Sequence, residues 1–213
     1  MITTTSILTE QLRSFADPAG KIMRMTKSGE LFPLTRGIYE TDGSVSGELL
    51  ASAIYGPSYL SFDYALSYYG LTPEAVYTFT CATFGKKKKK IYENKFGRYS
   101  YRDVPSAVYP LGVRVMENGG DTVPMASPEK ALCDKLWTLA PVHSMKELSA
   151  LLFDDLRIDE VEFSKLNKED LAEEFFRGQV DLLNDVLKEE RERLLRMQKA
   201  MEAEYNNLPK EYL

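Results

Sequence analysis

The chain of 213 residues contains only two cysteines and one histidine, too few for a disulfide-stabilised scaffold or a zinc site built from Cys and His. It also lacks long apolar runs, so no segment has the roughly 20 apolar residues that a membrane-spanning helix needs. The segment Met1–Phe15 has neither the basic start nor the continuous apolar stretch of a signal peptide. These absences predict a cytoplasmic protein without a membrane partner.

The side chains that enzymes use most often are also scarce. His143 is the only histidine, and its place in a loop before a helix favours a structural or solvent-facing role over one in a nucleophilic triad. Cys81 and Cys133 fall in a predicted strand and a predicted helix, where small buried apolar residues are expected. Gly85 and the lysines after it lack the second Gly and the Ser or Thr of a phosphate-binding P-loop. We therefore expect no enzyme activity, cofactor or metal; an acid-only metal site would need carboxylates that converge in space.

The formal net charge of −5 argues against a nucleic-acid partner, but the charge is unevenly distributed. Residues 1–104 hold 13 Lys and Arg against 10 Asp and Glu, whereas residues 105–213 hold 14 against 22. The front half is therefore net basic and the back half strongly acidic. Two interpretations stay open: an anionic partner contacts the front half, or both halves are simply solvated.

The first 45 residues are predicted to form a small unit. Asp17 and Pro18 are typical of a helix start, because Asp accepts hydrogen bonds from free amides and Pro at the first position loses none. The helix is expected to end at Gly29, and two short strands follow around a turn at Arg36-Gly37. A helix followed by a tight β-ribbon is the back half of a winged helix. Its candidate phosphate contacts are Lys21, Arg24, Lys27 and Arg36.

The middle of the chain is predicted to be a mixed α/β domain with antiparallel strands. Helices are expected over 48–55 and 61–69, the second with Ser61 as its cap. Runs of β-branched and aromatic residues predict strands at 76–83, 96–102, 113–115 and 122–125.

Five consecutive lysines lie between the first two of these strands. One interpretation is a solvated loop tip that joins the strands. The other is an anion contact, which Arg98 and Arg102 favour because residues four positions apart share one face of a strand. Lysine attracts phosphate without regard to base, so such a cluster would strengthen DNA binding without specifying a sequence. The members of the cluster are Lys86, Lys87, Lys88, Lys89, Lys90, Arg98 and Arg102.

The last part of the chain is predicted to be helical. Capping residues at Ser127, Ser144 and Asn167 each predict a helix start. A final helix, about 179–206, places apolar residues at the spacing of a heptad seam interrupted by one Glu. This seam either forms a homodimer or packs back on its own chain.

Four segments of the chain carry motifs of one known family, and they occur in that family's order. They are the wing at 29–39, the aromatic helix in Pro57–Leu71, the strand and basic loop unit at 76–101, and the Pro-Glu-Lys-Ala-Leu helix start in Ser127–Asp134. Through them the chain resembles the AbiEi-type antitoxins of bacterial abortive-infection systems. The resemblance spans about residues 17–140.

The resemblance implies a type IV antitoxin that counteracts a nucleotidyltransferase-like toxin, directly or indirectly, and represses its own promoter through a winged helix. Family members commonly have a full helix-turn-helix before the wing, whereas only 16 residues precede Asp17, so the unit 1–45 is abbreviated. The antitoxin domain would be 46–213, with an α/β part at 46–126 and a helical part at 127–213. The expected fold class is α+β. The alternative is a protein-interaction module of the same family without DNA binding.

Overall fold

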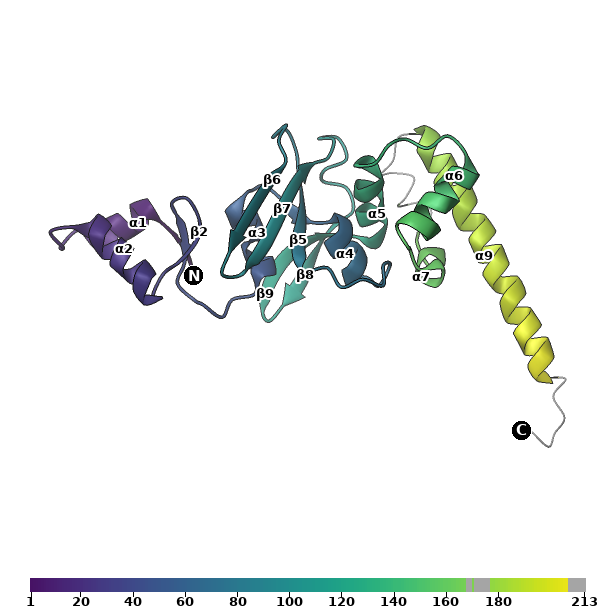
Figure 1. Cartoon of the computed structure of the whole chain (residues 1–213), viewed down its shortest axis with the longest axis horizontal. Coiled ribbons are helices and arrows are strands. Elements are labelled where there is room, and N and C mark those ends of the chain that lie inside the picture. The colour runs from purple at the N-terminus through teal and green to yellow at the C-terminus, as the bar shows by residue number, and fades with distance from the viewer. Residues whose placement is uncertain (168–169, 171–176, 207–213) are drawn as a thin grey trace.

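The computed structural model describes residues 1–167, 170 and 177–206, and it confirms the expected mixture of helices and strands. One antiparallel sheet and one mixed sheet combine with helices in an α+β architecture. Three parts follow one another along the longest axis of the molecule: a small N-terminal unit, a central sheet with its helices, and a helical part (Figure 1). The basic front of the chain and its acidic back therefore lie towards opposite ends of the molecule.

The N-terminal unit packs around a small core of its own. Its elements are β1 (Ile2–Thr4), α1 (Thr5–Gln11), α2 (Pro18–Ser28), β2 (Phe32–Thr35) and β3 (Ile38–Glu40). The strands form an antiparallel sheet in the order β1-β3-β2, and Leu8, Ile22 and Leu31 form the buried core of the unit. The predicted turn at Arg36-Gly37 joins β2 to β3. The sequence gives no sign of β1, because three residues are too few to show an alternating pattern.

The predicted ends of α2 are confirmed in atomic detail. The side chain of Asp17 accepts a hydrogen bond from the backbone N–H of Gly20 at 2.8 Å, and Pro18 occupies the first turn. Gly29 ends the helix with φ of +78°, a left-handed conformation that glycine adopts at little cost. Both ends are fixed by residues next to them in the chain, which is why the sequence could predict them.

The central sheet has the strand order β6-β7-β5-β4-β9-β8. Its strands are β4 (Tyr59–Leu60), β5 (Thr78–Thr83), β6 (Lys90–Asn94), β7 (Gly97–Asp103), β8 (Val113–Asn118) and β9 (Asp121–Ala126). β5 is parallel to β7, and β4 is parallel to β9 but antiparallel to β5. The sheet is therefore mixed, and the expectation of antiparallel strands holds for the hairpins β6–β7 and β8–β9 but is wrong for the parallel pairs.

The segment with the five lysines departs from the prediction. The lysine run does not simply join β5 to β7, because Lys90 begins an additional strand, β6, at the edge of the sheet. Inserting β6 reverses the chain once more, which is why β5 and β7 run parallel. Lysines on an edge strand also discourage pairing with strands of other molecules.

The alternating residues of β7 divide the two faces of the sheet. Tyr99 and Tyr101 are buried towards α3 (Gly47–Ile54), and their hydroxyls donate hydrogen bonds to the carbonyls of Gly47 at 3.0 Å and Ala51 at 2.7 Å. Ser100 and Arg102 point to the opposite face, where α4 (Phe62–Tyr68) and α5 (Pro128–Trp137) lie. In the sequence 96–102 aromatic residues alternate with polar or basic ones, a pattern typical of a half-exposed strand, and the two faces of β7 follow it.

One predicted helix cap is wrong. Ser61 precedes α4, but its side chain makes no capping hydrogen bond and instead donates to Asp134 at 2.6 Å. Thr80 on β5 takes over the cap, since its hydroxyl accepts the backbone N–H of Tyr64 at 3.0 Å. Neither partner is close in sequence, so local pattern could not predict the exchange.

The helical part contains short helices and one long one. They are α6 (Met145–Ser149), the π-helical segment η1 (Ala150–Asp155), α7 (Glu160–Ser164) and α9 (Arg177–Asn206). The predicted caps at Ser127 and Ser144 are confirmed, with side chains that accept the N–H groups of Lys130 and Glu147. The helix that we expected between Asn167 and Gly178 lies largely outside the described residues.

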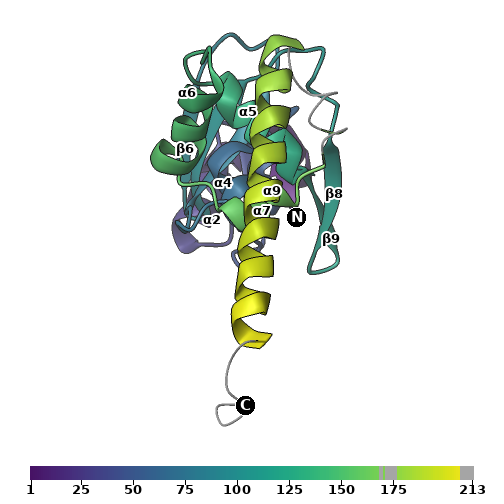
Figure 2. The ribbon, with the colours of Figure 1, turned by 90° about the vertical axis from the view of Figure 1, so that its right-hand side faces the viewer.

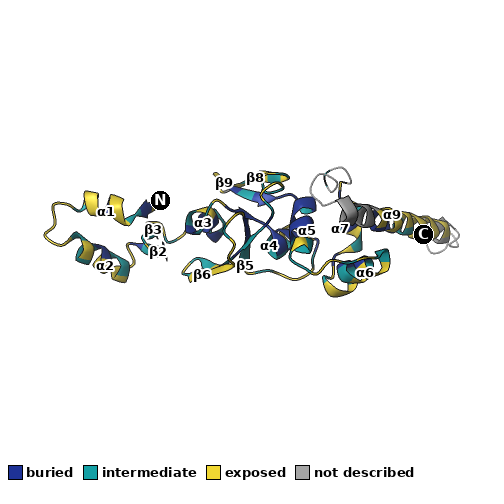
Figure 3. Ribbon diagram, turned by 90° about the horizontal axis from the view of Figure 1, so that it is seen from above, coloured by how far each residue is buried: buried dark blue, intermediate teal, exposed yellow. Residues whose placement is uncertain are grey.

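The long helix α9 packs on the body of the protein over only part of its length. Val186 and Leu187 are buried, and α9 runs alongside α6 and α7 before its end projects away (Figures 1 and 2). Further along, Leu195, Met197 and Met201 are 52%, 49% and 62% exposed, and Figure 3 shows the projecting end as mostly exposed. Within the described ranges, none of the helices combines the length and the apolar character that a bilayer crossing requires.

Candidate functional site

The basic residues predicted in the N-terminal unit lie on its surface. Arg24, Lys27 and Arg36 are exposed, and among the described residues none of them forms an ion pair or a side-chain hydrogen bond. Lys21 is half-buried, with its ammonium 5.7 Å from the centre of the Phe15 ring. Three of the four cations are therefore available to an anion.

These cations come from two different places in the unit. Arg24 and Lys27 are three residues apart on α2 and thus on neighbouring turns. Arg36 sits in the β2–β3 turn, whose Gly37 carbonyl accepts the N–H of Thr5 at 3.0 Å. The turn therefore lies at the start of α1.

The run of five lysines is only partly free to meet a ligand. Lys86 donates to the carbonyl of Gly56 at 3.0 Å, and its ammonium lies 5.1 Å from the centre of the Tyr55 ring. The backbone N–H of Lys87 donates to Asp103 at 2.6 Å, which fixes the loop to the end of β7. Lys88 and Lys89 are exposed in the loop, and so is Lys90 at the start of β6. The first lysine is thus a structural anchor, and those after it are exposed.

The structure separates the predicted phosphate contacts rather than joining them. The β6–β7 turn contacts the N-terminal unit: Phe32 of β2 packs edge-on against Phe96, with ring centres 5.9 Å apart. The lysine run lies at the other end of β6, about 15 Å away for a strand of this length. Arg98 lies near the turn and faces Glu93 across the strands, while Arg102 lies near the lysine end. The seven residues of the lysine cluster therefore do not form one patch.

Two motifs that are far apart in the sequence meet in the core. Lys130, from the Pro-Glu-Lys-Ala-Leu helix start, is fully buried, and its ammonium lies 3.1 Å from a carboxylate oxygen of Asp134, which is 2% exposed. The other oxygen of Asp134 accepts hydrogen bonds from Ser61 at 2.6 Å and from the Tyr59 hydroxyl at 2.9 Å. The Lys130 ammonium also donates to the carbonyl of Val108 at 2.7 Å. We name these five residues the buried charge network.

The environment of the network shifts the acidity of its carboxyl group. Burial raises the pKa of Asp134, although the ammonium of Lys130 and the hydrogen bonds from Ser61 and Tyr59 act in the opposite direction. Lysine is seldom fully buried without a partner. The lysine of the Pro-Glu-Lys-Ala-Leu motif therefore has a structural role in this buried pair and not a role on the surface. The spacing of Lys130 and Asp134 on one helix was the only signal in the sequence.

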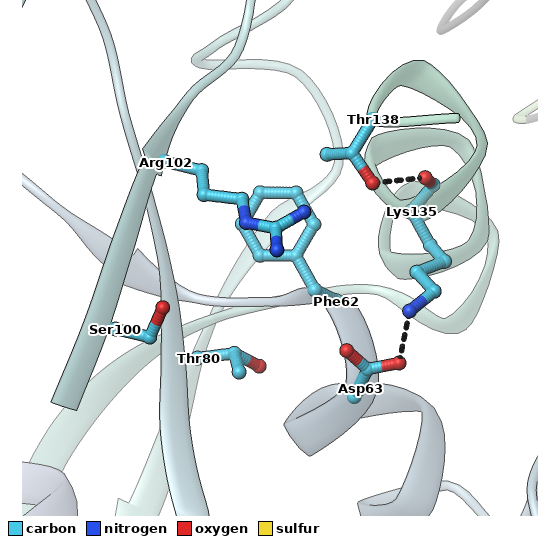
Figure 4. A pocket seen from close by; sticks show the side chains of 7 residues that line it. All are labelled: Phe62, Asp63, Thr80, Ser100, Arg102, Lys135 and Thr138. Carbon is cyan, nitrogen blue, oxygen red and sulfur yellow. Dashed lines mark hydrogen bonds and ion pairs between the residues drawn. The ribbon is translucent and has the colours of Figure 1, made fainter. Parts of the chain in front are cut away.

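A second ion pair joins α5 to α4 and lies nearer the surface. Lys135 of α5 lies 2.5 Å from a carboxylate oxygen of Asp63 of α4, at the edge of a hollow between these helices and the sheet (Figure 4). The hollow has a cavity volume of about 30 Å³. Its lining residues are Phe62, Asp63, Thr80, Ser100, Arg102, Lys135 and Thr138. We name it the Arg102 hollow.

Arg102 is the cation of this hollow that lacks a counter-charge. Its guanidinium points into the hollow and lies in front of the Phe62 ring in the view of Figure 4. Among the described residues, no acceptor forms a hydrogen bond or an ion pair with this group. The sequence predicted Arg102 as an exposed phosphate contact on a strand, but the residue is half-buried.

The remaining chemical candidates have structural surroundings. His143 is exposed, and its backbone N–H donates to Glu147 at 2.9 Å in the capping arrangement of α6. Cys81 and Cys133 are buried, as predicted, and burial raises the pKa of the Cys81 thiol. In the described part of the chain, no group of three or more His, Cys, Asp and Glu side chains is placed to hold a metal ion.

No protein-family model matches the chain, and no curated protein matches it.

Proposed function

We propose that this protein is an antitoxin of the AbiEi type, which contacts promoter DNA through its N-terminal unit and counteracts a nucleotidyltransferase-like toxin. The observation that carries the DNA contact is a set of exposed cations, without an ion pair among the described residues, on a unit with a small core of its own: Arg24 and Lys27 on α2 and Arg36 in the β2–β3 turn. Arginine and lysine on a helix and an adjacent turn suit the phosphates of duplex DNA, because such contacts position a protein on the backbone.

The distribution of charge supports a division of labour along the molecule. The front half carries the exposed cations of the N-terminal unit and of the lysine run, whereas the back half is net acidic and would repel DNA. The exposed Lys88, Lys89 and Lys90 lie away from the N-terminal unit and supply a second, weaker attraction to the same polyanion. The acidic helical part is left to engage protein.

The DNA contact is tested by titrating the full chain onto its own upstream DNA at several salt concentrations. Each phosphate contact contributes about 0.9 to the slope of log affinity against log salt. The variant Arg24→Ala/Lys27→Ala/Arg36→Ala is expected to lower that slope by about three and to weaken binding. The matched control Lys146→Ala/Arg196→Ala/Lys199→Ala removes three exposed cations from the acidic half and is expected to change neither. A salt-independent affinity, or equal effects of the two triple variants, would refute the DNA contact.

A second candidate is a protein-interaction module without DNA binding, and the projecting end of α9 favours it. Leu195, Met197 and Met201 are exposed there, beyond the stretch of α9 that packs on α6 and α7. Exposed apolar side chains on such a helix are typical of a docking or dimer surface. If the control and the test variant both leave a protective effect against the toxin intact and no DNA binding is found, this second candidate replaces the first.

The toxin part is tested by coexpression. We expect the gene next to that of this chain to encode a nucleotidyltransferase-like protein that arrests growth when expressed alone. Coexpression of the full chain is expected to restore growth. Failure to restore growth, with both proteins detected in the cell, would refute the antitoxin function independently of the DNA result.

A further inference from the structure

We propose that the Arg102 hollow binds a single phosphate group. The inference goes beyond the proposed DNA contact, because it concerns an inward-facing site on the central sheet rather than the surface of the N-terminal unit. It rests on charge, on burial and on the hydrogen-bonding groups that line the hollow.

Within the part of the chain that the structure describes, the positive charge of Arg102 in the hollow has no counter-charge. Lys135 is neutralised by Asp63 at 2.5 Å, so the guanidinium of Arg102 leaves the lining with one net positive charge. A half-buried cation has lost part of its hydration, and without a counter-charge that loss is unfavourable. An anion in the hollow would restore the balance.

The shape and the donors of the hollow select the kind of anion. The guanidinium presents several N–H donors in a planar fork that matches two oxygens of a phosphate group. Ser100 and Lys135, also in the lining, can add a hydroxyl and an ammonium donor. The hollow lies between two helices and a sheet, and its cavity volume of about 30 Å³ leaves room for a small anion such as one phosphate group and not for a whole nucleotide.

The backbone at the hollow is strained in a way that suits a binding site. Phe62, which lines the hollow, has φ of +55°, in the left-handed region that bulky residues avoid. The conformation is kept because Ser61 is held by Asp134 and Tyr64 by Thr80, on either side of Phe62. Strain that the surrounding contacts maintain is found preferentially at ligand sites.

The proposal is tested by isothermal titration of the full chain with inorganic phosphate and pyrophosphate at constant ionic strength. Wild type is expected to bind, and Arg102→Ala is expected to weaken binding at least about tenfold, the effect of losing one charge-assisted hydrogen bond. Arg98→Ala is the matched control, because Arg98 lies on the same face of β7 but outside the hollow. It is expected to leave phosphate affinity unchanged.

A gain-of-binding variant separates a binding role from a structural one. Asp63→Asn removes the negative charge beside Lys135 and raises the net charge of the hollow from one to two, so phosphate affinity is expected to rise severalfold. A destabilised protein would not bind more tightly. Circular dichroism melts of each variant show whether it is folded, and Arg102→Gln replaces Arg102→Ala if the latter does not fold.

The source of the phosphate group is decided by a second titration with single-stranded and duplex oligonucleotides. If phosphate competes with an oligonucleotide and both depend on Arg102, the group belongs to nucleic acid. If oligonucleotide binding is unaffected by Arg102→Ala while phosphate binding is weakened, the group belongs to a small ligand, and both results support the site. Wild type that binds no phosphate probe, or Arg102→Ala and Arg98→Ala with equal effects, would overturn it. The triple variant of the N-terminal unit tests the proposed DNA contact separately.

Discussion

Separating the two charges of the buried network should reveal how strongly it holds α5 to the sheet. In Lys130→Met, the carboxylate of Asp134 stays in the core and keeps the hydroxyls of Ser61 and Tyr59 as partners. In Asp134→Asn, the shape and both hydroxyl bonds are kept, but the ammonium of Lys130 loses its counter-charge at 3.1 Å. Each single variant removes one charge of the buried pair Lys130–Asp134 and is expected to lower the free energy of unfolding by about 3–5 kcal/mol.

The double variant Lys130→Met/Asp134→Asn should be far less destabilised than the sum of the two. It removes both charges together and leaves chiefly the carbonyl of Val108 without its donor, which costs about 1–3 kcal/mol. The coupling free energy between the two positions is therefore expected to reach at least about 3 kcal/mol. Equilibrium unfolding in urea, followed by circular dichroism, measures all four proteins at one pH.

The pH dependence of the same variants gives a second measurement. Because burial raises the pKa of Asp134, the folded protein retains this proton at pH values where the unfolded chain has released it. Its contribution to stability therefore falls as the pH rises from the unfolded pKa, about 3.9, through the folded pKa. Without Lys130 the pKa of Asp134 rises further, so in Lys130→Met this carboxyl group takes up its proton at a higher pH than in wild type. The loss in free energy of unfolding caused by Lys130→Met should therefore become smaller as the pH is lowered towards 5.

Two results would refute this reasoning. Single variants that each cost less than about 1 kcal/mol would mean that water or a conformational shift relieves the stranded charge. Additive effects in the double variant would mean that Lys130 and Asp134 are not energetically coupled, whatever their distance.

The same urea experiment tests Tyr101→Phe, which removes the hydroxyl that donates to the carbonyl of Ala51 and is expected to lower the free energy of unfolding by about 1 kcal/mol. Its control is Tyr77→Phe, at a position that is 87% exposed, and this variant should show no measurable change. Gly47→Ala should destabilise the protein by about 1–3 kcal/mol, because the added Cβ would lie 2.5 Å from the Phe79 ring; an unchanged midpoint would contradict the packing of β5 on α3. Cys81 and Cys133 should resist a thiol reagent at pH 8 in the native protein and react once the protein is unfolded. Both side chains are buried, and burial raises the pKa of the Cys81 thiol. Rapid labelling of the native protein would contradict this prediction.

The local features of the fold could be predicted well from the sequence. Asp17 and Gly29 bound α2 because a helix cap depends on atoms within a few residues. The alternation in β7 predicted which side chains are buried, because successive residues of any strand point to opposite faces. The direction of β7 was missed, because the short exposed strand β6 shows no pattern that distinguishes it from a loop.

The candidate site was predicted less completely, since burial and partners depend on segments that meet only in the folded chain. The sequence placed Arg102 and the lysines in one basic cluster. The structure puts Arg102 in a hollow, Lys86 on the carbonyl of Gly56 and Arg98 near the N-terminal unit. No pattern along the chain could show that Lys130 is fully buried.

The sequence by itself determined the mixture of helices and strands, most of the helix ends and the division into a basic front and an acidic back, because these depend on composition and near neighbours. Only the tertiary structure decided which cations are free. Lys130 and Lys135 are neutralised by Asp134 and Asp63, whereas Arg102 is left without a counter-charge in the described part of the chain. The physical reason is that the energy of a charge depends on its hydration and on its nearest opposite charge, and both are set by residues distant in sequence.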